Sequence, residues 1–472
     1  MLFNSIEFLL FLPIVFVLYW FVFDKKLKYQ NLLILASSYI FYGWWDYRFL
    51  SLILLSTIVD YFIGLRISNQ ASLKNKRILL WCSVLFNLGV LGFFKYYNFF
   101  IDSWIDLFSY VGYDIKSVWT LNIILPVGIS FYTFQTMSYT IDIFKGKLKP
   151  TKDFISFASF VSFFPQLVAG PIERASNLLP QILKKRVFKY EQGVQGLRLI
   201  LWGMFKKVVI ADSLAPVINN IFGNYQEFGG GTLWLGAIYF AFQIYCDFSG
   251  YSDIAIGTSK LFGFELMSNF KFPYFSRNIG EFWRRWHISL STWFRDYLYI
   301  PLGGSKEGKW KSIRNVFIIF LVSGFWHGAN WTFIFWGGFH AILFLPSFIS
   351  NTNRKYTSSI IAENTLLPSI KEFLQVIITL ILVTLGWVFF RSESIELSFE
   401  YLMKMILEFG LPWKYRSGLM YVVCIFIMDY LVRRNERLNI KYFKFDWVLF
   451  SILILLILEK FGSYNEFIYF QF

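Results

Sequence analysis

The chain has 472 residues, of which 56% are hydrophobic, 22% aromatic and only 16% charged, and its mean hydropathy is +0.50. Soluble proteins carry about 25% charged residues, so this composition excludes soluble, disordered, collagen-like and disulfide-scaffold classes and indicates a polytopic membrane protein. The net charge is +15. Because Lys and Arg lie in loops between apolar runs, they indicate membrane orientation, and no nucleic-acid partner is expected.

Apolar runs recur along the whole chain, and a membrane-spanning helix needs about 20 mostly apolar residues. The runs lie at residues 6–23, 31–45, 49–65, 78–98, 119–144, 197–216, 231–248, 313–336, 337–349, 371–390, 417–432 and 446–459. We predict an all-α polytopic fold with about 10 to 13 membrane segments, some of them tilted or only partly inserted. No basic region precedes the first run and no small-residue cleavage site follows it, so it is expected to be a retained span.

Basic loops predict the orientation of the first spans. Lys residues cluster at 25–28, after the first run, and Lys and Arg cluster again at 66–77, two runs later. The two clusters therefore fall on the same side of the membrane, which the excess of positive charge marks as the cytoplasm. This places the N-terminus outside.

Two features depart from the regular alternation of apolar spans and basic cytoplasmic loops. The apolar stretch 153–171 has basic residues before it and again at 184–189, and it contains two prolines and a glycine. A re-entrant hairpin explains this pattern, and an ordinary span with imperfect charge bias is the alternative. Within the run 197–216, Lys206 and Lys207 are expected to snorkel to the interface, with a polar pathway as the second interpretation.

The chain contains only three histidines, His287, His327 and His340, within one stretch of 54 residues. His287 lies in the segment 281–300, where Trp, Phe and Arg alternate at helical spacing, as is typical of an amphipathic helix at the cytoplasmic interface. His327 lies 14 residues into the run that begins at Ile313. That is about 21 Å along a helix and deep in a hydrocarbon layer about 30 Å thick. His340 is interpreted as a packing or supporting residue.

An ionisable residue inside a membrane is a functional candidate by default. Burial keeps an imidazole neutral and basic, so it can accept the proton of a hydroxyl group as the oxygen attacks an activated acyl group. The alternative is a structural histidine bonded to a backbone carbonyl of a neighbouring helix. The repetition of a Trp-His pair at 286–287 and 326–327 favours the functional interpretation.

The three cysteines, Cys82, Cys246 and Cys424, lie far apart in apolar stretches. Their spacing fits neither a metal site nor a disulfide framework, so they are interpreted as buried structural thiols. No metal or bound cofactor is predicted.

The sequence around the histidines resembles the membrane-bound O-acyltransferases. The motifs are Phe-Trp-Arg-Arg-Trp-His-Ile-Ser-Leu-Ser at 282–291, Phe-Arg-Asp-Tyr-Leu-Tyr-Ile-Pro-Leu-Gly-Gly at 294–304 and Gly-Phe-Trp-His-Gly-Ala-Asn-Trp at 324–331. Upstream, Leu-Pro-Val-Gly-Ile-Ser-Phe at 125–131 and Phe-Pro-Gln-Leu-Val-Ala-Gly-Pro-Ile-Glu-Arg at 164–174 resemble the bacterial alginate O-acetyltransferase branch. The resemblance covers most of the chain.

The resemblance implies a ring of membrane helices around a central tunnel, with His327 as the catalytic histidine and His287 as the second characteristic polar position. The residues proposed to line the tunnel flank these histidines; they are Trp286, Ser291, Arg295, Asp296, Trp326 and Asn330. The chain, 1–472, is expected to be a single integral membrane domain. Its N-terminal spans lie at 1–150, its catalytic core at about 151–349 and its C-terminal spans at 350–472.

The resemblance also implies a function: transfer of an acyl group, most simply acetyl, from a cytoplasmic thioester to hydroxyl groups of a cell-surface polysaccharide such as alginate. The expected donor is acetyl-CoA or an acyl carrier protein, and a periplasmic or extracellular partner is expected to complete the transfer. The expected location is the bacterial cytoplasmic (inner) membrane.

Three alternatives remain open. Peptidoglycan O-acetylation and teichoic acid D-alanylation are the two acyl-transfer alternatives, and the motifs at 168–174 and 301–304 are more similar to the alginate and peptidoglycan branches than to the third. A transporter or flippase for a lipid-linked sugar is the alternative from another class. Its pathway would be lined by charged residues in apolar surroundings, namely Asp142, Lys206, Lys207, Asp247 and Asp253.

Overall fold

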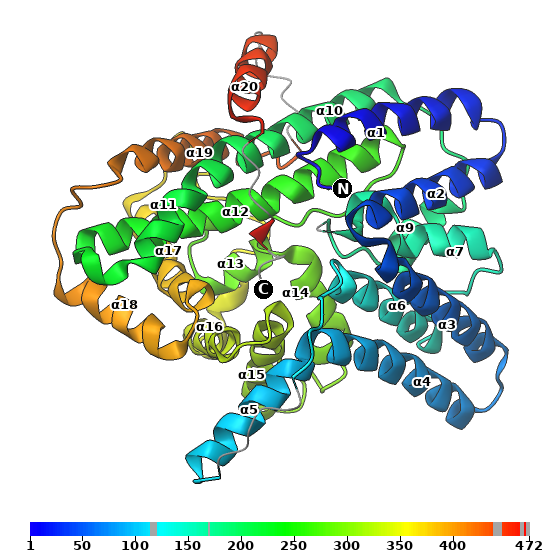
Figure 1. Ribbon diagram of the computed structural model, residues 1–472, viewed down its shortest axis with the longest axis horizontal. Helices are drawn as coiled ribbons and strands as arrows, with labels where there is room; N and C mark the ends of the chain where they lie inside the picture. The colour runs from blue at the N-terminus through cyan, green and yellow to red at the C-terminus, as the bar shows by residue number, and fades with distance from the viewer. Residues whose placement is uncertain (114–119, 169, 438–445, 463–466, 469–472) are drawn as a thin grey trace. The chain divides into compact units, whose positions relative to one another are not determined.

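The computed structural model describes residues 1–113, 120–168, 170–437, 446–462 and 467–468, and in this part of the chain every regular element is a helix (Figure 1). The all-α prediction is therefore confirmed. The chain forms two compact units, and each is described by itself. Unit 1 comprises Met1–Tyr190 with Ser259–Leu266, and unit 2 comprises Glu191–Thr258 with Met267–Phe472.

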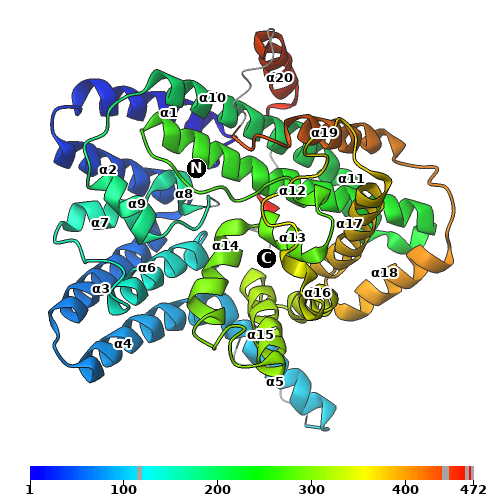
Figure 2. The same cartoon turned by 180° about the vertical axis from the view of Figure 1, so that it is seen from behind.

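The described residues of unit 1 form nine α-helices. They are α1 (Ile6–Val17), α2 (Leu27–Asp46), α3 (Leu50–Asn69), α4 (Leu73–Leu91), α5 (Tyr97–Tyr110), α6 (Ile129–Phe144), α7 (Phe154–Val161), α8 (Phe164–Leu167) and α9 (Ala175–Ile182). Helices α3 and α4 pack against each other and against α6, as Figure 2 shows. Between α3 and α4 the carboxylate of Asp60 accepts hydrogen bonds from Ser83 and Asn87, so the polar groups inside this apolar packing satisfy one another.

The stretch 153–171 does not form a straight crossing helix. It is divided into α7, of eight residues, and α8, of four, with a break at Ser162 and Phe163, and the helical residues Ser156 to Leu167 are buried. A helix of eight residues is about 12 Å long, well short of the hydrocarbon thickness. The observed helices favour the re-entrant interpretation over an ordinary span.

Unit 2 contains the remaining α-helices. They are α10 (Tyr190–Met204), α11 (Asp212–Gly223), α12 (Gly230–Leu261), α13 (Ile279–Arg285), α14 (Ile288–Phe294), α15 (Lys309–His327), α16 (Trp331–Ile349), α17 (Ile370–Arg391), α18 (Ile395–Leu407), α19 (Leu419–Val432) and α20 (Asp446–Lys460). Single π-helical turns follow α10 at Phe205–Ala211 and α14 at Arg295–Tyr299. Such turns in helices are frequent at functional sites.

Four stretches of the described chain are long and apolar enough to cross a membrane: Leu27–Asn69, Leu73–Tyr110, Trp331–Ile349 and Ile370–Arg391. Ile6–Val22 and Phe154–Leu167 are shorter apolar helices. Other helices are short or carry charges, as α12 does with Asp247, Asp253 and Lys260. The chain is thus a multi-pass membrane protein, while the number of 10 to 13 segments stays a prediction.

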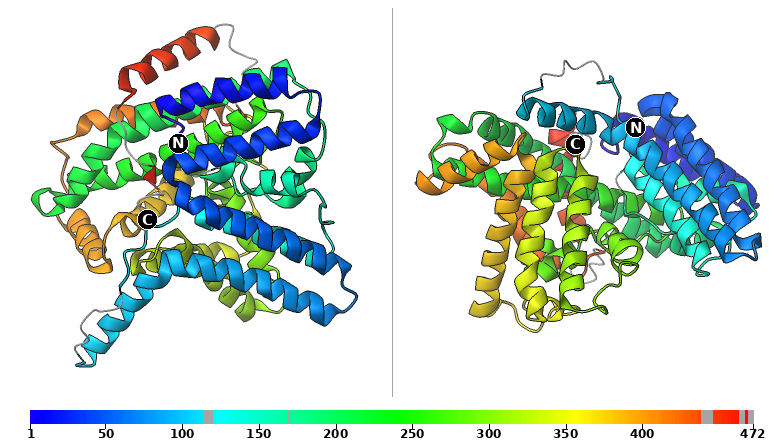
Figure 3. Two further views of the ribbon diagram at one scale, coloured as in Figure 1. Left: turned by 45° about the vertical axis from the view of Figure 1, so that its right-hand side comes forward. Right: turned by 90° about the horizontal axis from the view of Figure 1, so that it is seen from below.

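Helices α15 and α16 form a hairpin, and α17 lies beside α16 (Figure 3). A Cβ atom on Gly324 would lie 2.1 Å from the carbonyl oxygen of Phe333, and one on Gly337 would lie 2.3 Å from that of Phe320. Only glycine permits this approach of the two backbones. The prediction of one continuous apolar segment at 313–336 is therefore wrong, because the chain turns between His327 and Trp331.

Lys206 and Lys207 do not snorkel. Their side chains are at most 4% exposed, and Nζ of Lys206 lies 2.6 Å from Oδ2 of Asp253. Nζ of Lys207 lies 2.8 Å from Oδ1 of Asp212 and 2.8 Å from Oδ1 of Asp247. Two of these aspartates come from α12, and ion pairing offsets the cost of burying the charges, so the snorkelling prediction is corrected.

The cysteine prediction holds in part. All three cysteines are free, but only Cys246 is buried, whereas Cys424 is half-buried and Cys82 is exposed. Cys82 lies on α4, a helix whose apolar outer face is not covered by the rest of unit 1.

Candidate active site

His287 lies at a break between two short helices. Its backbone has φ 44° and ψ 55°, a left-handed conformation that ends α13 and begins α14. The segment is therefore not the continuous interfacial helix predicted from its alternating Trp, Phe and Arg, and its imidazole is 1% exposed. A left-handed residue other than glycine costs about 1–3 kcal/mol and is found most often at functional sites.

A buried amide holds the His287 ring. Nδ1 lies 3.0 Å from Oδ1 of Asn269, and the same oxygen accepts hydrogen bonds from the backbone N–H and the hydroxyl of Ser289. The Asn269 NH₂ group in turn donates to the hydroxyl of Ser252. Since Oδ1 is an acceptor, Nδ1 carries the proton and Nε2 carries the basic lone pair. Burial lowers the pKa of His287, so the ring is neutral.

His327 is the last residue of α15 and is 3% exposed. Eighteen residue steps separate it from Lys309, which corresponds to about 27 Å of helix. It therefore lies at the end of a helix rather than midway along a continuous one. Its ring packs against Trp336 and Phe390, with ring centres 5.2 and 5.4 Å away, and its centre is 6.4 Å from that of His287. The structure thus brings the two predicted histidines together.

The third histidine belongs to the same aromatic cluster. Trp336 lies between His327 and His340, with its ring centre 5.0 Å from that of His340. His340 is fully buried, and neither of its ring nitrogens has a hydrogen-bond partner among the described residues. The indole N–H groups of Trp283, Trp286 and Trp336 are likewise buried without a partner in that part of the chain. Buried donors without partners mark a place where a polar ligand or ordered water is received.

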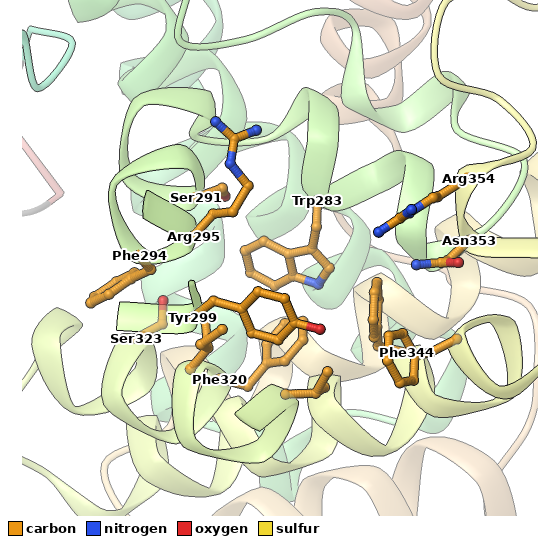
Figure 4. Close-up of a pocket in the computed structure, with 13 residues that line it drawn as sticks. Trp283, Ser291, Phe294, Arg295, Tyr299, Phe320, Ser323, Phe344, Asn353 and Arg354 are labelled. Atoms are coloured by element: carbon orange, nitrogen blue, oxygen red, sulfur yellow. The ribbon is translucent and has the colours of Figure 1, made fainter. Parts of the chain in front are cut away.

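A cavity of about 210 Å³ adjoins this cluster (Figure 4). Its walls are mainly apolar and aromatic side chains of α13, α14, α15 and α16, and it includes Ser323, which lies one helical turn before His327. Trp283 forms part of the wall and also packs 5.0 Å from His340, so the cavity and the histidine cluster share this indole. In Figure 4 the side chains of Arg295 and Arg354 lie on opposite sides of the Trp283 indole. An apolar cavity with a few polar groups is the usual form of a small-ligand site.

The other predicted tunnel residues fall into three groups. Ser291 and Arg295 line the cavity, and Arg295 also pairs with Asp296 at 2.7 Å. Trp286 and Trp326 are buried, and the ring centre of Trp326 is 5.9 Å from that of His287. Asn330 has a capping role, because its side-chain oxygen accepts a hydrogen bond from the first turn of α16.

Several residues of the site have no signal in the sequence. Trp387 and Phe390 of α17 pack on the histidine cluster, and Asn269 orients His287, although all three are distant from the histidine motifs in the chain. An asparagine in an apolar setting is the only hint that could have identified Asn269. No group of three or more His, Cys, Asp and Glu residues suited to a metal ion occurs where the structure is described.

Comparison with known proteins identifies the family. A family model described as MBOAT, membrane-bound O-acyltransferase family, matches residues 90–359. A Pseudomonas aeruginosa protein named probable alginate O-acetylase AlgI is 41% identical over 413 residues, covering 87% of this chain and 75% of the relative. The Azotobacter vinelandii protein of the same name is 41% identical, covering 85% and 77%. A peptidoglycan O-acetyltransferase of Helicobacter pylori is 35% identical, covering 86% and 80%.

Fold and comparisons together define an all-α integral membrane enzyme that transfers acyl groups to oxygen. The chain belongs to the membrane-bound O-acyltransferase family. The predicted family, its enzymatic class and its membrane character are confirmed, and an acyltransferase of this family uses an acyl donor as co-substrate.

Proposed function

We propose that this enzyme transfers an acetyl group from a cytoplasmic thioester towards hydroxyl groups of a cell-surface polysaccharide, with alginate as the first candidate acceptor. The observation that carries the proposal is the buried pair of His287 and His327, with ring centres 6.4 Å apart, beside an apolar cavity. At this separation one substrate group can contact both rings.

His327 acts as the general base in the proposed step. Its imidazole takes the proton of the acceptor hydroxyl while the oxygen attacks the carbonyl carbon of the thioester. The C–O bond forms, the C–S bond breaks, and the proton passes to the departing thiolate. General-base assistance of this kind contributes about 10²- to 10⁴-fold in rate. His287, neutral and fixed by Asn269, orients the reacting groups through Nε2.

The cavity beside the cluster is suited to the donor. Its apolar walls fit the thioester arm, and Arg354 supplies positive charge for the anionic groups of a donor such as acetyl-CoA or an acyl carrier protein, whereas Arg295 is paired with Asp296. The indole N–H groups near the histidines are suited to the oxygen atoms of an acyl group or a sugar hydroxyl.

A second cavity, of about 340 Å³, is suited to the acceptor. It lies at the C-terminal end of α17 and is lined by polar and aromatic residues that include Tyr225, Arg391 and Glu393. Arg391 directly follows Phe390, whose ring packs on His327, and the Asn330 side chain donates a hydrogen bond to the Glu393 carbonyl oxygen. The donor cavity contacts α15 along residues 316–323, before His327, so His327 lies between the two cavities in this proposal.

The relatives guide the choice of acceptor. Those named alginate O-acetylase are 40–42% identical to this chain, and the one named peptidoglycan O-acetyltransferase is 35% identical. Alginate is therefore the first candidate and peptidoglycan the second. A transporter has no specific support, because four of the charged residues considered for its pathway, Lys206, Lys207, Asp247 and Asp253, pair with one another.

We also propose that the enzyme resides in the bacterial cytoplasmic membrane and passes the acetyl group to a periplasmic or extracellular partner protein. This proposal is supported by the apolar helices of the described chain and by the relatives named as O-acetylases of extracellular polymers.

The test uses membrane vesicles that contain the enzyme, the periplasmic extract of the same cells as the source of the partner, and a labelled acetyl thioester. Mannuronate oligomers and peptidoglycan fragments are offered as acceptors, and labelled ester on each sugar is measured. His327→Ala is expected to lower the rate by about 10²- to 10⁴-fold. His340→Leu is the matched control, since this histidine is equally buried in the same cluster but has no proposed role. Transfer by a normally folded His327→Ala variant at the wild-type rate would refute the mechanism. Ester formed only on peptidoglycan fragments would identify peptidoglycan, and not alginate, as the acceptor.

A further inference from the structure

A third cavity of unit 2, the basic pocket, is defined by its charge. It has a volume of about 460 Å³ and is formed by α13, the segment after α16 and the segment after α19. Among the described residues, one carboxylate, that of Glu436, and six cationic side chains line it. The cationic residues are Lys271, Arg284, Arg285, Arg433, Arg434 and Arg437. No described residue lines both this pocket and the donor cavity, so the two are separate sites.

Carboxylates balance only part of the charge of the basic pocket. Glu436 pairs with Lys271 at 3.1 Å, and Glu281 pairs with Arg285 at 2.7 Å. These pairs account for two of the six cations, so the pocket keeps an excess of positive charge. A concave surface of this kind attracts anions.

Three arginines of the pocket have hydrogen-bond partners that carry no net charge. Arg433 and Arg434 donate to backbone carbonyl oxygens of the segment before α17. Arg284 donates to the carbonyl oxygens of Asn353 and Tyr356. The Nε–H of Arg284 is also buried without a hydrogen-bond partner in the part of the chain that the structure describes. A buried guanidinium donor is costly unless a ligand or water accepts its hydrogen bond, and phosphate oxygens fit this role.

The charges of the α15–α16 hairpin indicate on which side of the membrane the pocket lies. Three cations lie in the first turns of α15 and two more, at 354–355, follow α16, whereas the turn at 328–330 between the two helices contains no charged residue. Because basic residues collect on the cytoplasmic side, this asymmetry places the end of α16 at the cytoplasmic face. Residues 356–358, which line the pocket, follow that end directly.

Exposed apolar helix faces adjoin the basic pocket. Phe272 lines the pocket and belongs to an apolar cluster that contains Val376, from the first two turns of α17. Phe426 and Tyr430, from the end of α19, pack on the same cluster. The start of α17 and the end of α19 therefore meet beside the pocket. Both helices carry large apolar residues there that are more than half exposed, namely Ile370, Phe373, Leu374, Ile427 and Leu431.

We propose that the basic pocket binds the phosphate headgroup of an anionic phospholipid, whose acyl chains lie along the exposed apolar faces of α17 and α19. The excess of cations attracts the phosphate, and the apolar faces favour a lipid over a soluble anion. Basic pockets between membrane helices on the cytoplasmic side are typical sites for such headgroups. The site is separate from the acyl-transfer chemistry, so its occupancy can be measured without acetyl transfer.

Native mass spectrometry of the delipidated full-length protein tests the proposal, because each bound lipid adds its own mass. The probes are phosphatidylglycerol and phosphatidylcholine with the same acyl chains. We expect one phosphatidylglycerol molecule to bind with a Kd at least about tenfold lower than that of phosphatidylcholine, as the excess of cations requires.

The variant combines Lys271→Gln with Arg434→Gln, because both side chains are exposed and their replacement leaves the packing intact. It should raise the Kd for phosphatidylglycerol about 5- to 30-fold, since each cation near an anionic lipid contributes a factor of about five. The Kd for phosphatidylcholine should not change. The matched control is Lys306→Gln with Lys309→Gln, which removes two exposed cations at the start of α15 outside the pocket and should leave both affinities unchanged.

Three results would overturn the proposal. The first is equal phosphatidylglycerol affinity of the pocket variant and the wild type. The second is an equal loss of affinity in the control variant, which would indicate a general effect of surface charge. The third is displacement of phosphatidylglycerol by inorganic phosphate or CoA in the wild type, which would make the pocket a site for a soluble anion.

Discussion

Asn269→Ala provides the sharpest test of how the site is organised. The Asn269 side chain fixes the His287 ring, because its Oδ1 accepts the Nδ1–H hydrogen bond at 3.0 Å. Without this acceptor the ring loses both its orientation and the preference for the tautomer that presents a basic Nε2. We therefore expect kcat to fall while KM for the donor changes little, since Asn269 does not line the donor cavity.

The size of the effect follows from the contacts. Asn269 makes four hydrogen bonds: one with His287, two with Ser289 and one with Ser252. At about 1 kcal/mol each, their loss lowers the free energy of unfolding by about 4 kcal/mol. Only the bond to His287 bears on catalysis. A buried group left without it costs about 1–3 kcal/mol, which corresponds to a fall in kcat of about 5- to 150-fold.

The assay is a double-mutant cycle that measures acetyl transfer in vesicles. Asn269→Ala is made in the wild type and in His287→Ala, and it should reduce kcat only where His287 is present. Ser252→Ala is the matched control, because it removes one hydrogen bond of Asn269 without touching His287 and should lower stability by about 1 kcal/mol with kcat unchanged. An equal reduction of kcat in both backgrounds would refute the positioning role.

Three further predictions concern packing and charge. Gly324→Ala should lower the free energy of unfolding by more than about 2 kcal/mol, because the new Cβ would lie 2.1 Å from a backbone oxygen of the facing helix. Its control, Gly338→Ala, meets only a leucine methyl at 3.6 Å and should leave the thermal stability unchanged or raise it. Lys207→Met should lower the free energy of unfolding by about 3–5 kcal/mol, because it removes the lysine that pairs with two buried aspartates. The control is Lys184→Met at an exposed site, and equal melting temperatures of the two variants would contradict this prediction. His340→Leu should retain kcat within about threefold, since a side chain of similar size is tolerated in packing; a loss as large as that of His327→Ala would make His340 part of the chemistry.

Local sequence patterns predicted the site's components but not their arrangement. The scarcity of histidine and the Trp-His repetition selected His287 and His327, and the structure brings their rings to 6.4 Å. The helix containing His287 was mispredicted because the alternation of Trp, Phe and Arg fits a surface helix. Tertiary packing instead buries the imidazole and forces a left-handed residue between two short helices.

Buried polar partners explain most of the remaining errors. Lys206 and Lys207 were expected to snorkel because their aspartate partners lie up to 47 residues away, and the sequence does not state which residues of α12 will face them. Similarly, the turn after His327 interrupts an apolar run that contains no proline and only two glycines, Gly324 and Gly328. The hairpin forms because the glycines of α15 and α16 allow the backbones to approach.

The amino-acid sequence by itself determined the membrane class, the helical fold and the residue types able to carry out acyl transfer, because these depend on composition and on motifs within one or two helical turns. Only the tertiary structure decided which distant groups meet: the amide that orients His287 and the aspartates that neutralise the buried lysines. Such contacts depend on which helix faces turn towards each other, and the geometry of packing sets this over long sequence separations.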